Sequence, residues 1–120
     1  MPKKILVADD EEEIIEFIQT AFEREGYQTV STIHGSRLIA LIKTENPDLV
    51  VLDVMLPGID GYSLQLQLAQ DETTKHIPVI VMTALPASRA LFEKFEQVKM
   101  FLPKPFEIDV LLSKVREILK

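Results

Sequence analysis

The chain has 120 residues, 47% of them hydrophobic, which fits one domain over residues 1–120 that closes around one core. Its formal net charge of −6 argues against direct nucleic-acid binding, because such surfaces need clustered Lys and Arg. The absence of cysteine excludes disulfides and thiolate metal sites, and the first apolar run is far too short for a signal peptide or a membrane span, so we expect a cytoplasmic protein without membrane contact.

Short apolar or β-branched runs alternate with longer amphipathic segments along the chain. Five runs predict strands, at residues 4–8, 28–32, 48–53, 78–83 and 99–102. Three of the five are nearly all apolar, as expected for a parallel sheet that helices cover on both faces. The alternation indicates repeated βαβ units and therefore a doubly wound α/β fold.

Helices between the strands follow from the spacing of apolar residues and from stop signals. An apolar stripe over residues 14–22 predicts the first helix, which ends at Gly26, a residue suited to a left-handed C-terminal position. The second helix, around residues 37–43, is halted before Pro47. The last helix has the clearest pattern, because residues 108–119 carry apolar side chains at i, i+3, i+4 and i+7.

The segment from Gly61 to Asp71 has an ambiguous pattern. Its LQLQL run alternates like a strand, while Leu64 and Leu68 also fit one face of a helix. Topology decides for a helix, since a parallel crossover between the third and fourth strands needs one. That choice predicts an exposed Leu66.

Polar side chains lie at the ends of four predicted strands or directly after them. They are Asp9 and Asp10, Asp53, Thr83 and Lys104. In a parallel sheet these ends share one rim, where crowded carboxylates raise one another's pKa unless a cation neutralises them. Mg²⁺ prefers oxygen ligands and typically takes one or two carboxylates plus waters. We therefore predict a magnesium site with Asp10 and Asp53 as direct ligands and Asp9 bound through water.

The five acids at residues 9–13 do not share one role. Asp9 and Asp10 are predicted to face the pocket, whereas residues 11–13 lie in the first turn of a helix, where the helix dipole stabilises negative charge. An alternative makes Asp10 the helix N-cap, with Glu13 completing a capping box. The groups at the other strand ends favour the pocket, because helix capping at residue 10 predicts none of them.

Five motifs follow one another at these strand ends. They are the pair Asp9-Asp10, "DVMLPGIDG" from Asp53, "MTA" with Thr83, an aromatic residue at 101, and "KPF" from Lys104. Together they resemble the receiver domains of two-component response regulators over essentially the whole chain. The resemblance implies a flavodoxin-like (βα)5 fold with a five-stranded parallel sheet in the order 2-1-3-4-5.

The resemblance also implies a phosphoacceptor. Asp53 would take a phosphoryl group from a phosphohistidine on a sensor histidine kinase or a histidine phosphotransfer protein. Asp9, Asp10, Asp53 and the Met55 carbonyl would hold Mg²⁺. The chain would then catalyse its own phosphorylation and dephosphorylation without being a conventional enzyme.

The remaining family positions concern the phosphoryl group and the switch. By resemblance, Lys104, the Thr83 hydroxyl and the Ala84 amide take the phosphoryl oxygens, and Pro105 follows a cis peptide bond. Phosphorylation would draw Thr83 toward the phosphoryl group and turn Phe101 inward. The output would be an altered affinity for a downstream protein or output domain, or a phosphorylation-dependent homodimer, at the surface of the fourth helix, the fifth strand and the fifth helix.

Departures from the family pattern precede the fifth strand. Gln97 and Val98 stand where receivers usually carry a small Gly-Ala pair, and Pro86 lies near the start of the fourth helix. We expect a remodelled output surface. The turn that contains Pro57 and Gly58 is expected to shape the loop beside the metal pocket.

Two other functions were weighed against the phosphoacceptor. An aspartyl phosphatase would carry a DxD motif, but Val54 and Met55 follow Asp53. A binding or dimerisation module that keeps the fold without being phosphorylated stays open as the alternative. Met55 and Leu85 are apolar at positions that tune the access of water to the acyl phosphate in this family, which predicts slow self-dephosphorylation.

Overall fold

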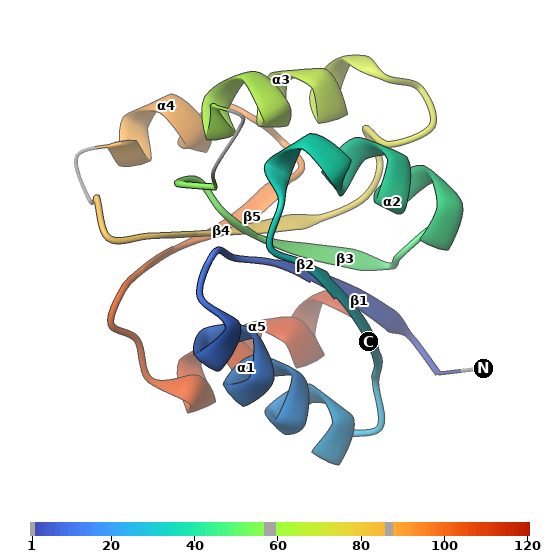
Figure 1. Ribbon diagram of the computed structural model, residues 1–120, viewed down its shortest axis with the longest axis vertical. Coiled ribbons are helices and arrows are strands. Elements are labelled where there is room, and N and C mark those ends of the chain that lie inside the picture. Colours follow the sequence, from blue (N-terminus) through green and yellow to red (C-terminus); the bar gives the residue numbers. More distant parts are fainter. Residues whose placement is uncertain (1, 57–59, 86–87) are drawn as a thin grey trace.

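Five parallel strands form the centre of the computed structural model, which describes residues 2–56, 60–85 and 88–120. The sheet has the order β2-β1-β3-β4-β5, as predicted, and the fold is flavodoxin-like (Figure 1). The strands are β1 (Lys4–Ala8), β2 (Gln28–Thr32), β3 (Leu49–Asp53), β4 (Val79–Thr83) and β5 (Val98–Pro103). The sequence predictions on Pro57, Gly58 and Pro86 concern positions outside the described residues.

The limits of three strands differ from the predicted ones, each by one residue at an end. β3 begins after Asp48, whose side chain accepts a hydrogen bond of 2.8 Å from the Lys4 main-chain N–H. β4 begins after Pro78, which has no N–H to donate to a ladder. β5 extends one residue beyond the prediction at each end.

Helices cover both faces of the sheet, with α1 and α5 on one face and α2, α3 and α4 on the other (Figure 1). Their limits are α1 (Glu12–Arg24), the 3-10 helix η1 (Gly35–Arg37), α2 (Leu38–Glu45), α3 (Gly61–Gln70), α4 (Arg89–Glu93) and α5 (Ile108–Ile118). No helix in the described ranges is long and apolar enough to cross a membrane.

Two of the helix ends use left-handed backbone. After α1 the chain turns at Gly26, which has φ +92°, a conformation that is unstrained only for glycine. α2 ends at Asn46, which has φ 47° and whose main-chain N–H donates to the Ile42 carbonyl. Asn is among the few residues that tolerate this region, and Pro47 behind it prevents the helix from continuing.

Alternate residues of each inner strand enter two separate cores. In β1, Ile5 and Val7 pack with α1 and α5, whereas Leu6 and Ala8 pack with α2, α3 and α4. β3 and β4 divide their side chains in the same way. Both faces of these strands are buried, which explains their continuous apolar sequence.

α3 is a helix, as topology predicted, but its rotation differs from the expectation. Leu64, Gln65 and Leu68 face inward and are buried, while Leu66 is only partly exposed, so the prediction of an exposed Leu66 is wrong. A polar side chain thus takes a core position. It pairs with Gln97, because Gln65 Nε2 donates a hydrogen bond of 2.8 Å to Gln97 Oε1.

Candidate functional site

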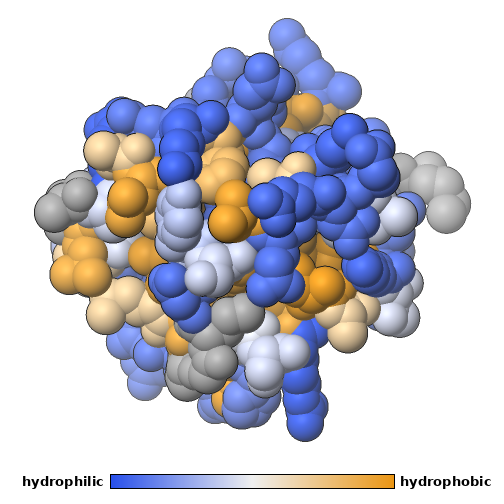
Figure 2. Space-filling view, turned by 90° about the horizontal axis from the view of Figure 1, so that it is seen from above, coloured by the Kyte–Doolittle hydropathy of each residue, from blue (hydrophilic) through white to orange (hydrophobic). Residues whose placement is uncertain are grey.

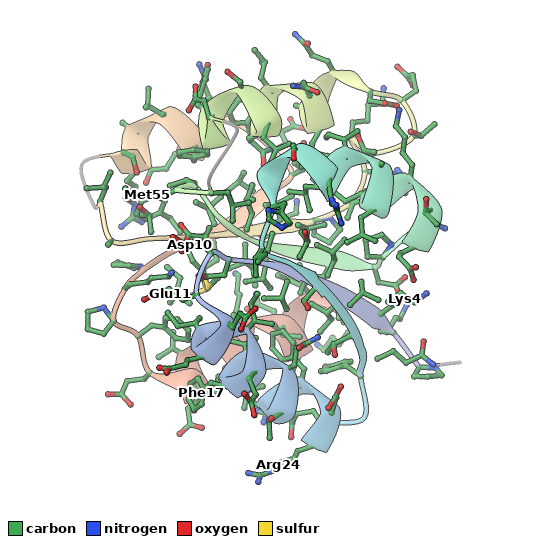
Figure 3. All side chains as sticks on the ribbon, viewed as in Figure 1. Lys4, Asp10, Glu11, Phe17, Arg24 and Met55 are labelled. Atoms are coloured by element: carbon green, nitrogen blue, oxygen red, sulfur yellow. The ribbon has the colours of Figure 1, made fainter. Side chains whose placement is uncertain are left out.

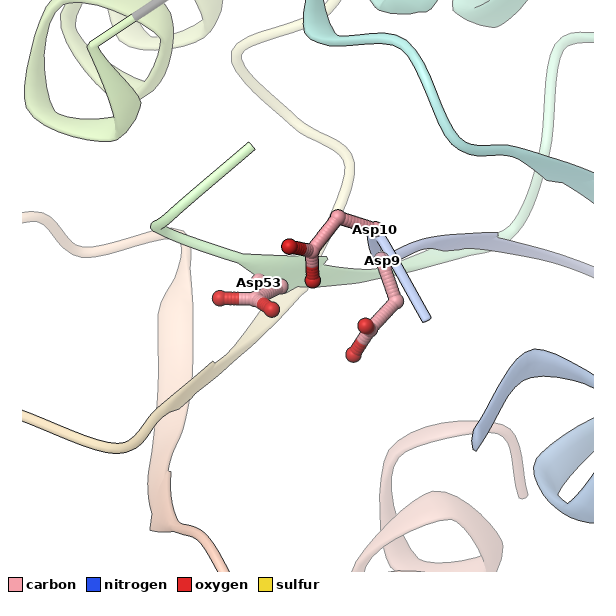
Figure 4. Close-up of side chains that lie close together, drawn as sticks. All are labelled: Asp9, Asp10 and Asp53. Atoms are coloured by element: carbon pink, nitrogen blue, oxygen red, sulfur yellow. The ribbon is translucent and has the colours of Figure 1, made fainter. Parts of the chain in front are cut away.

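Three carboxylates converge at the carboxyl ends of β1 and β3 (Figure 4). Oxygen atoms of Asp9, Asp10 and Asp53 all lie within 4.8 Å of one another. β1 pairs directly with β3 in the sheet, which brings residues far apart in the sequence to one rim. Asp9 and Asp53 are buried, whereas Asp10 is exposed.

The Lys104 ammonium joins two of these carboxylates. Its Nζ lies 2.7 Å from Asp9 Oδ2 and 2.9 Å from Asp53 Oδ2, and its side chain is 12% exposed. The Lys104 main-chain N–H donates to the Thr83 carbonyl at 2.8 Å, which fixes residue 104 beside the end of β4. The Lys104–Pro105 peptide bond is cis, as the resemblance implies.

The remaining oxygens of the buried carboxylates accept main-chain hydrogen bonds. Asp9 Oδ1 accepts from the Glu11 N–H and Asp53 Oδ1 from the Met55 N–H, both at 2.9 Å. These bonds hold each carboxylate in one orientation. Asp10 is the exposed member of the cluster and is labelled in Figure 3.

The alternative of Asp10 as a helix N-cap is wrong. The N-cap of α1 is Glu11, which makes no side-chain capping bond, and the helix begins at Glu12. Glu11 was expected within the first turn of the helix, but it lies just before the helix, at the N-cap position. The reason is the bond from the Glu11 N–H to Asp9, which turns the chain before the helix starts.

The charges at the rim do not balance within the protein. Burial raises the pKa of Asp9, despite its hydrogen bonds with Lys104 and the Glu11 amide. Burial alone would lower the pKa of Lys104, but the hydrogen bonds to Asp9 and Asp53 outweigh it and raise that pKa. Three carboxylates against one ammonium leave a formal charge of −2. This all-oxygen set therefore fits a hard divalent cation such as Mg²⁺.

The predicted phosphate-binding residues lie on the neighbouring strand. Thr83 ends β4 and is fully buried, and its hydroxyl accepts a hydrogen bond of 2.9 Å from the Leu85 N–H. β3 and β4 are paired, with Asp53 opposite Met82, so Thr83 and Ala84 leave the sheet next to the carboxylates. Their part in phosphate binding, like that of the Met55 carbonyl in metal binding, stays a prediction.

Phe101 lies apart from the carboxylates, within β5. Its side chain is partly buried and packs against the core under α2, α3 and α4. The Arg89 guanidinium of α4 lies 5.9 Å from the centre of its ring. The candidate switch residue is therefore in contact with α4 through a cation–π pair.

Sequence reasoning missed three features of the structure. Glu11 Oε2 lies 3.7 Å from Lys104 Nζ, and the position of Glu11 directly after the acidic pair was the available signal. Gln97 was noted as a departure from the family pattern, but its pairing with a buried Gln65 was not predicted. A groove of about 410 Å³ was also missed; it is lined by Glu11, Ile14, Phe17, Ala84, Lys104, Pro105 and Phe106.

Residues 5–116 match the family model described as response regulator receiver domain. The chain is 34% identical over 119 residues to the response regulator PleD of Caulobacter vibrioides, covering 98% of this chain and 26% of PleD. It is 36% identical over 124 residues to the alkaline phosphatase synthesis transcriptional regulatory protein PhoP of Bacillus subtilis, covering 100% of this chain and 50% of PhoP. The chain thus spans about a quarter to a half of the length of these two relatives.

Other known proteins match over nearly their whole length. The polar-differentiation response regulator DivK of Brucella anthropi is 28% identical over 121 residues, which cover 99% of this chain and 98% of DivK. A solved putative response regulator from Chloroflexus aurantiacus superposes with a TM-score of 0.90 at 29% identity, covering 99% of this chain and 98% of that one. TrrA of Thermotoga maritima, solved in complex with Mg(2+)-BeF, gives 0.85 at 29% identity, with coverages of 97% and 98%.

Proposed function

The chain belongs to the response regulator receiver family, and on this premise we propose that it is the phosphoacceptor of a two-component or phosphorelay system, with Asp53 as the phosphorylated residue. In this proposal residues 1–120 form one receiver domain, which works in the cytoplasm. The donor is a phosphohistidine on a sensor histidine kinase or a histidine phosphotransfer protein. The observation that carries the proposal is the Lys104 ammonium between the buried Asp9 and Asp53 carboxylates.

The transfer is a displacement at phosphorus. One Asp53 carboxylate oxygen forms the new O–P bond as the N–P bond to the donor histidine breaks, and the bond's electron pair leaves with the imidazole. Asp9, Asp10, Asp53 and the Met55 carbonyl would hold Mg²⁺, which would neutralise negative charge on the moving phosphoryl group. Lys104 supplies a second positive charge beside the same carboxylate.

The groove beside Lys104 gives the donor a way to Asp53. Phe17 projects from α1 and is 53% exposed, and the groove next to it has a mainly apolar lining. Large exposed apolar side chains next to a reactive site are typical of a protein contact surface. We assign this groove to the partner that carries the phosphohistidine.

The output lies on the other side of the rim, at α4, β5 and α5. Figure 2 views the molecule from the side of α2, α3 and α4 and shows hydrophobic patches at its left edge and among hydrophilic side chains elsewhere on this face. Leu85, Leu91 and Val110 are the exposed large apolar residues of this region. Phosphorylation changes how Thr83 and Phe101 pack, and so favours one arrangement of this surface for a downstream protein, an output domain or a second copy of the chain.

The alternative is a binding or dimerisation module that keeps the fold without being phosphorylated. It requires neither the acidic rim nor Lys104. The phosphoacceptor is favoured by the complete set of rim residues, Asp9, Asp10, Asp53, Thr83 and Lys104. A module that is not phosphorylated does not require these side chains to lie together.

The test is incubation with Mg²⁺ and acetyl phosphate, followed by measurement of the intact mass. We expect one added phosphoryl group on the unmodified chain and none on Asp53→Asn or in the presence of a chelator. An unmodified chain that gains no mass would contradict the proposal. A gain on Asp53→Asn would show that another residue is phosphorylated.

A further inference from the structure

We propose that α3 forms a second link between Asp53 and α4, separate from Thr83 and Phe101. This inference rests on the proposed phosphoacceptor function. It concerns how the charge on Asp53 reaches the output surface. Three successive contacts carry it: the turn after β3, the first residue of α3, and an aromatic cluster between α3 and α4.

The first contact is the turn that follows Asp53. Asp53 Oδ1 accepts a hydrogen bond of 2.9 Å from the Met55 N–H, and the Val54 N–H donates to the Met82 carbonyl at 3.2 Å. Phosphorylation converts the carboxylate into an acyl phosphate and moves its negative charge onto the phosphoryl oxygens. The Asp53 oxygen then becomes a weaker acceptor for Met55, so the turn at residues 54–55 responds directly to the reaction.

The second contact is a direct approach of α3 to this turn. Gly61 is the buried first residue of α3, and a Cβ added to it would lie 2.6 Å from Val54 Cα and collide with the Val54 carbonyl oxygen. No side chain separates the two main chains. Because close-packed atoms transmit a displacement rather than absorb it, a movement of Val54 displaces the start of α3.

The third contact passes from the start of α3 to α4 and the residues behind it. The Tyr62 ring centre lies 6.1 Å from that of Phe92, with the rings inclined at 71°, and 5.8 Å from that of Phe95. The Lys94 ammonium lies 4.9 Å from the centre of the Tyr62 ring and 5.6 Å from that of Phe95. Edge-to-face rings and a cation on an aromatic face favour one geometry, so α4 follows Tyr62.

A buried amide pair holds α3 one turn further along. Gln65 Nε2 donates to Gln97 Oε1, and Gln97 Nε2 donates to the carbonyls of Ile77 at 2.9 Å and Thr74 at 3.2 Å. The middle of α3 is thereby tied to the segment before β5. A displacement at Gly61 consequently tilts α3 about this pair and moves Tyr62 with it.

The amide pair is not fully satisfied. Gln65 Oε1 is buried and has no hydrogen-bond partner among the described residues. A buried acceptor without a donor raises the free energy of this arrangement. The proposal requires a second arrangement of α3, because coupling between sites needs an element with two states, and Gln65 is where we expect the two arrangements to differ.

The α3 link and the Thr83 link act on different parts of α4. Thr83 binds the Leu85 N–H before the helix, and Phe101 contacts Arg89 at its first residue. Tyr62 contacts Phe92 and Phe95 toward and beyond its end. The two links can therefore be removed one at a time.

The experiment compares Tyr62→Leu with the matched control Tyr62→Phe, which keeps the ring. Beryllofluoride with Mg²⁺ serves as the phosphoryl analogue; ¹⁹F NMR measures its binding, and amide hydrogen exchange of residues 89–98 measures the response. We expect the unmodified chain and Tyr62→Phe to respond alike, and Tyr62→Leu to lose at least half of the change in exchange. Because coupling is reciprocal, Tyr62→Leu also shifts the affinity for beryllofluoride by about fivefold.

A second variant guards against misfolding of the first. Lys94 is exposed, so Lys94→Met removes the cation from the Tyr62 ring without entering the core. Lys94→Met should also reduce the change in hydrogen exchange of residues 89–98, as Tyr62→Leu does. A full response in both Tyr62→Leu and Lys94→Met would overturn the α3 link, while the phosphoacceptor function would stand. Failure of the unmodified chain to bind beryllofluoride would overturn both.

Discussion

Lys104 stands 51 positions after Asp53 in the chain, yet its ammonium donates a hydrogen bond of 2.9 Å to the Asp53 carboxylate. The same ammonium bonds Asp9 at 2.7 Å. One cation thus offsets part of the repulsion between two buried carboxylates from neighbouring strands. Lys104 therefore bears on both the stability of the rim and its chemistry.

Lys104→Met should slow phosphorylation by acetyl phosphate by roughly 10²- to 10³-fold, the usual cost of losing one preorganised charge-stabilising group. It should also lower the free energy of unfolding by about 3–5 kcal/mol, since Asp9 and Asp53 lose their buried partner. Intact-mass kinetics and urea unfolding measure the two effects. Lys104→Arg, which keeps the charge, is the control, and a Met variant as fast as this control would contradict the assigned role.

Mg²⁺ should stabilise the folded chain. At a concentration one hundred times its dissociation constant, an ion that binds only the folded state adds about 2.7 kcal/mol to the free energy of unfolding. Asp10→Asn should abolish most of this gain, because it removes the exposed carboxylate of the cluster. Thermal unfolding at constant ionic strength, with Na⁺ replacing Mg²⁺, separates binding from screening. Equal stabilisation by both salts would exclude a specific site.

Gln97→Leu should destabilise the protein by more than a surface substitution does. It leaves Gln65 Nε2 without its acceptor and the Thr74 and Ile77 carbonyls without that donor, at about 1–3 kcal/mol for each unsatisfied group. In the Gln97→Leu background, Gln65→Leu should lower the free energy of unfolding by less than it does in the unmodified chain. Urea unfolding should give a coupling energy of about 0.5–3 kcal/mol between the two substitutions. Strict additivity would mean that the two amides do not interact.

The hydrogen bonds and ion pair of Asp71 lead us to predict that the protein loses stability at acid pH. The Lys43 ammonium lies 2.8 Å from its carboxylate, and Thr73 donates through its hydroxyl and main-chain N–H. Chiefly through Lys43, these groups lower the pKa of Asp71 below its ordinary value of 3.8. The resulting stability is present above pH 3.8 and is lost as pH falls toward the folded-state pKa. Asp71→Asn should therefore destabilise at pH 7, by an amount that shrinks below pH 4 in urea titrations.

The acyl phosphate on Asp53 should be long-lived. Met55 and Leu85 are each 51% exposed and offer no polar atom in the side chain, apart from the weakly accepting sulfur, to orient a water molecule. We expect a lifetime of minutes or more in the purified protein with Mg²⁺, and a shorter one for Met55→Asn. Loss of the added phosphoryl mass over time provides the measurement. A lifetime of seconds in the unmodified chain would contradict this expectation.

The sheet and its rim could be predicted because their signals are local. Continuous apolar runs mark buried parallel strands, and parallel strands bring their carboxyl ends to one edge. Asp9, Asp53 and Lys104 therefore meet as expected. The sequence left open whether Asp10 caps α1, because Asp9 and Asp10 can each accept a nearby main-chain N–H, and the structure shows that the Glu11 N–H donates to Asp9.

The rotation of α3 could not be predicted from its own sequence. Leu64, Leu66 and Leu68 alternate with glutamines, so several helix faces have similar hydrophobicity. Burial of Gln65 depends on a partner 32 positions away, Gln97, whose Oε1 accepts a hydrogen bond from the Gln65 amide nitrogen. Such a pair becomes recognisable only when the fold brings both residues together.

The sheet is a partition between two separately packed interiors. Leu6 and Val7 are neighbours in the chain, yet the first belongs to the layer of α2, α3 and α4 and the second to the layer of α1 and α5. A volume change in one layer can be compensated by substitutions within that layer alone. New specificities can therefore evolve by rebuilding the α4 side, while the α1 side keeps its packing.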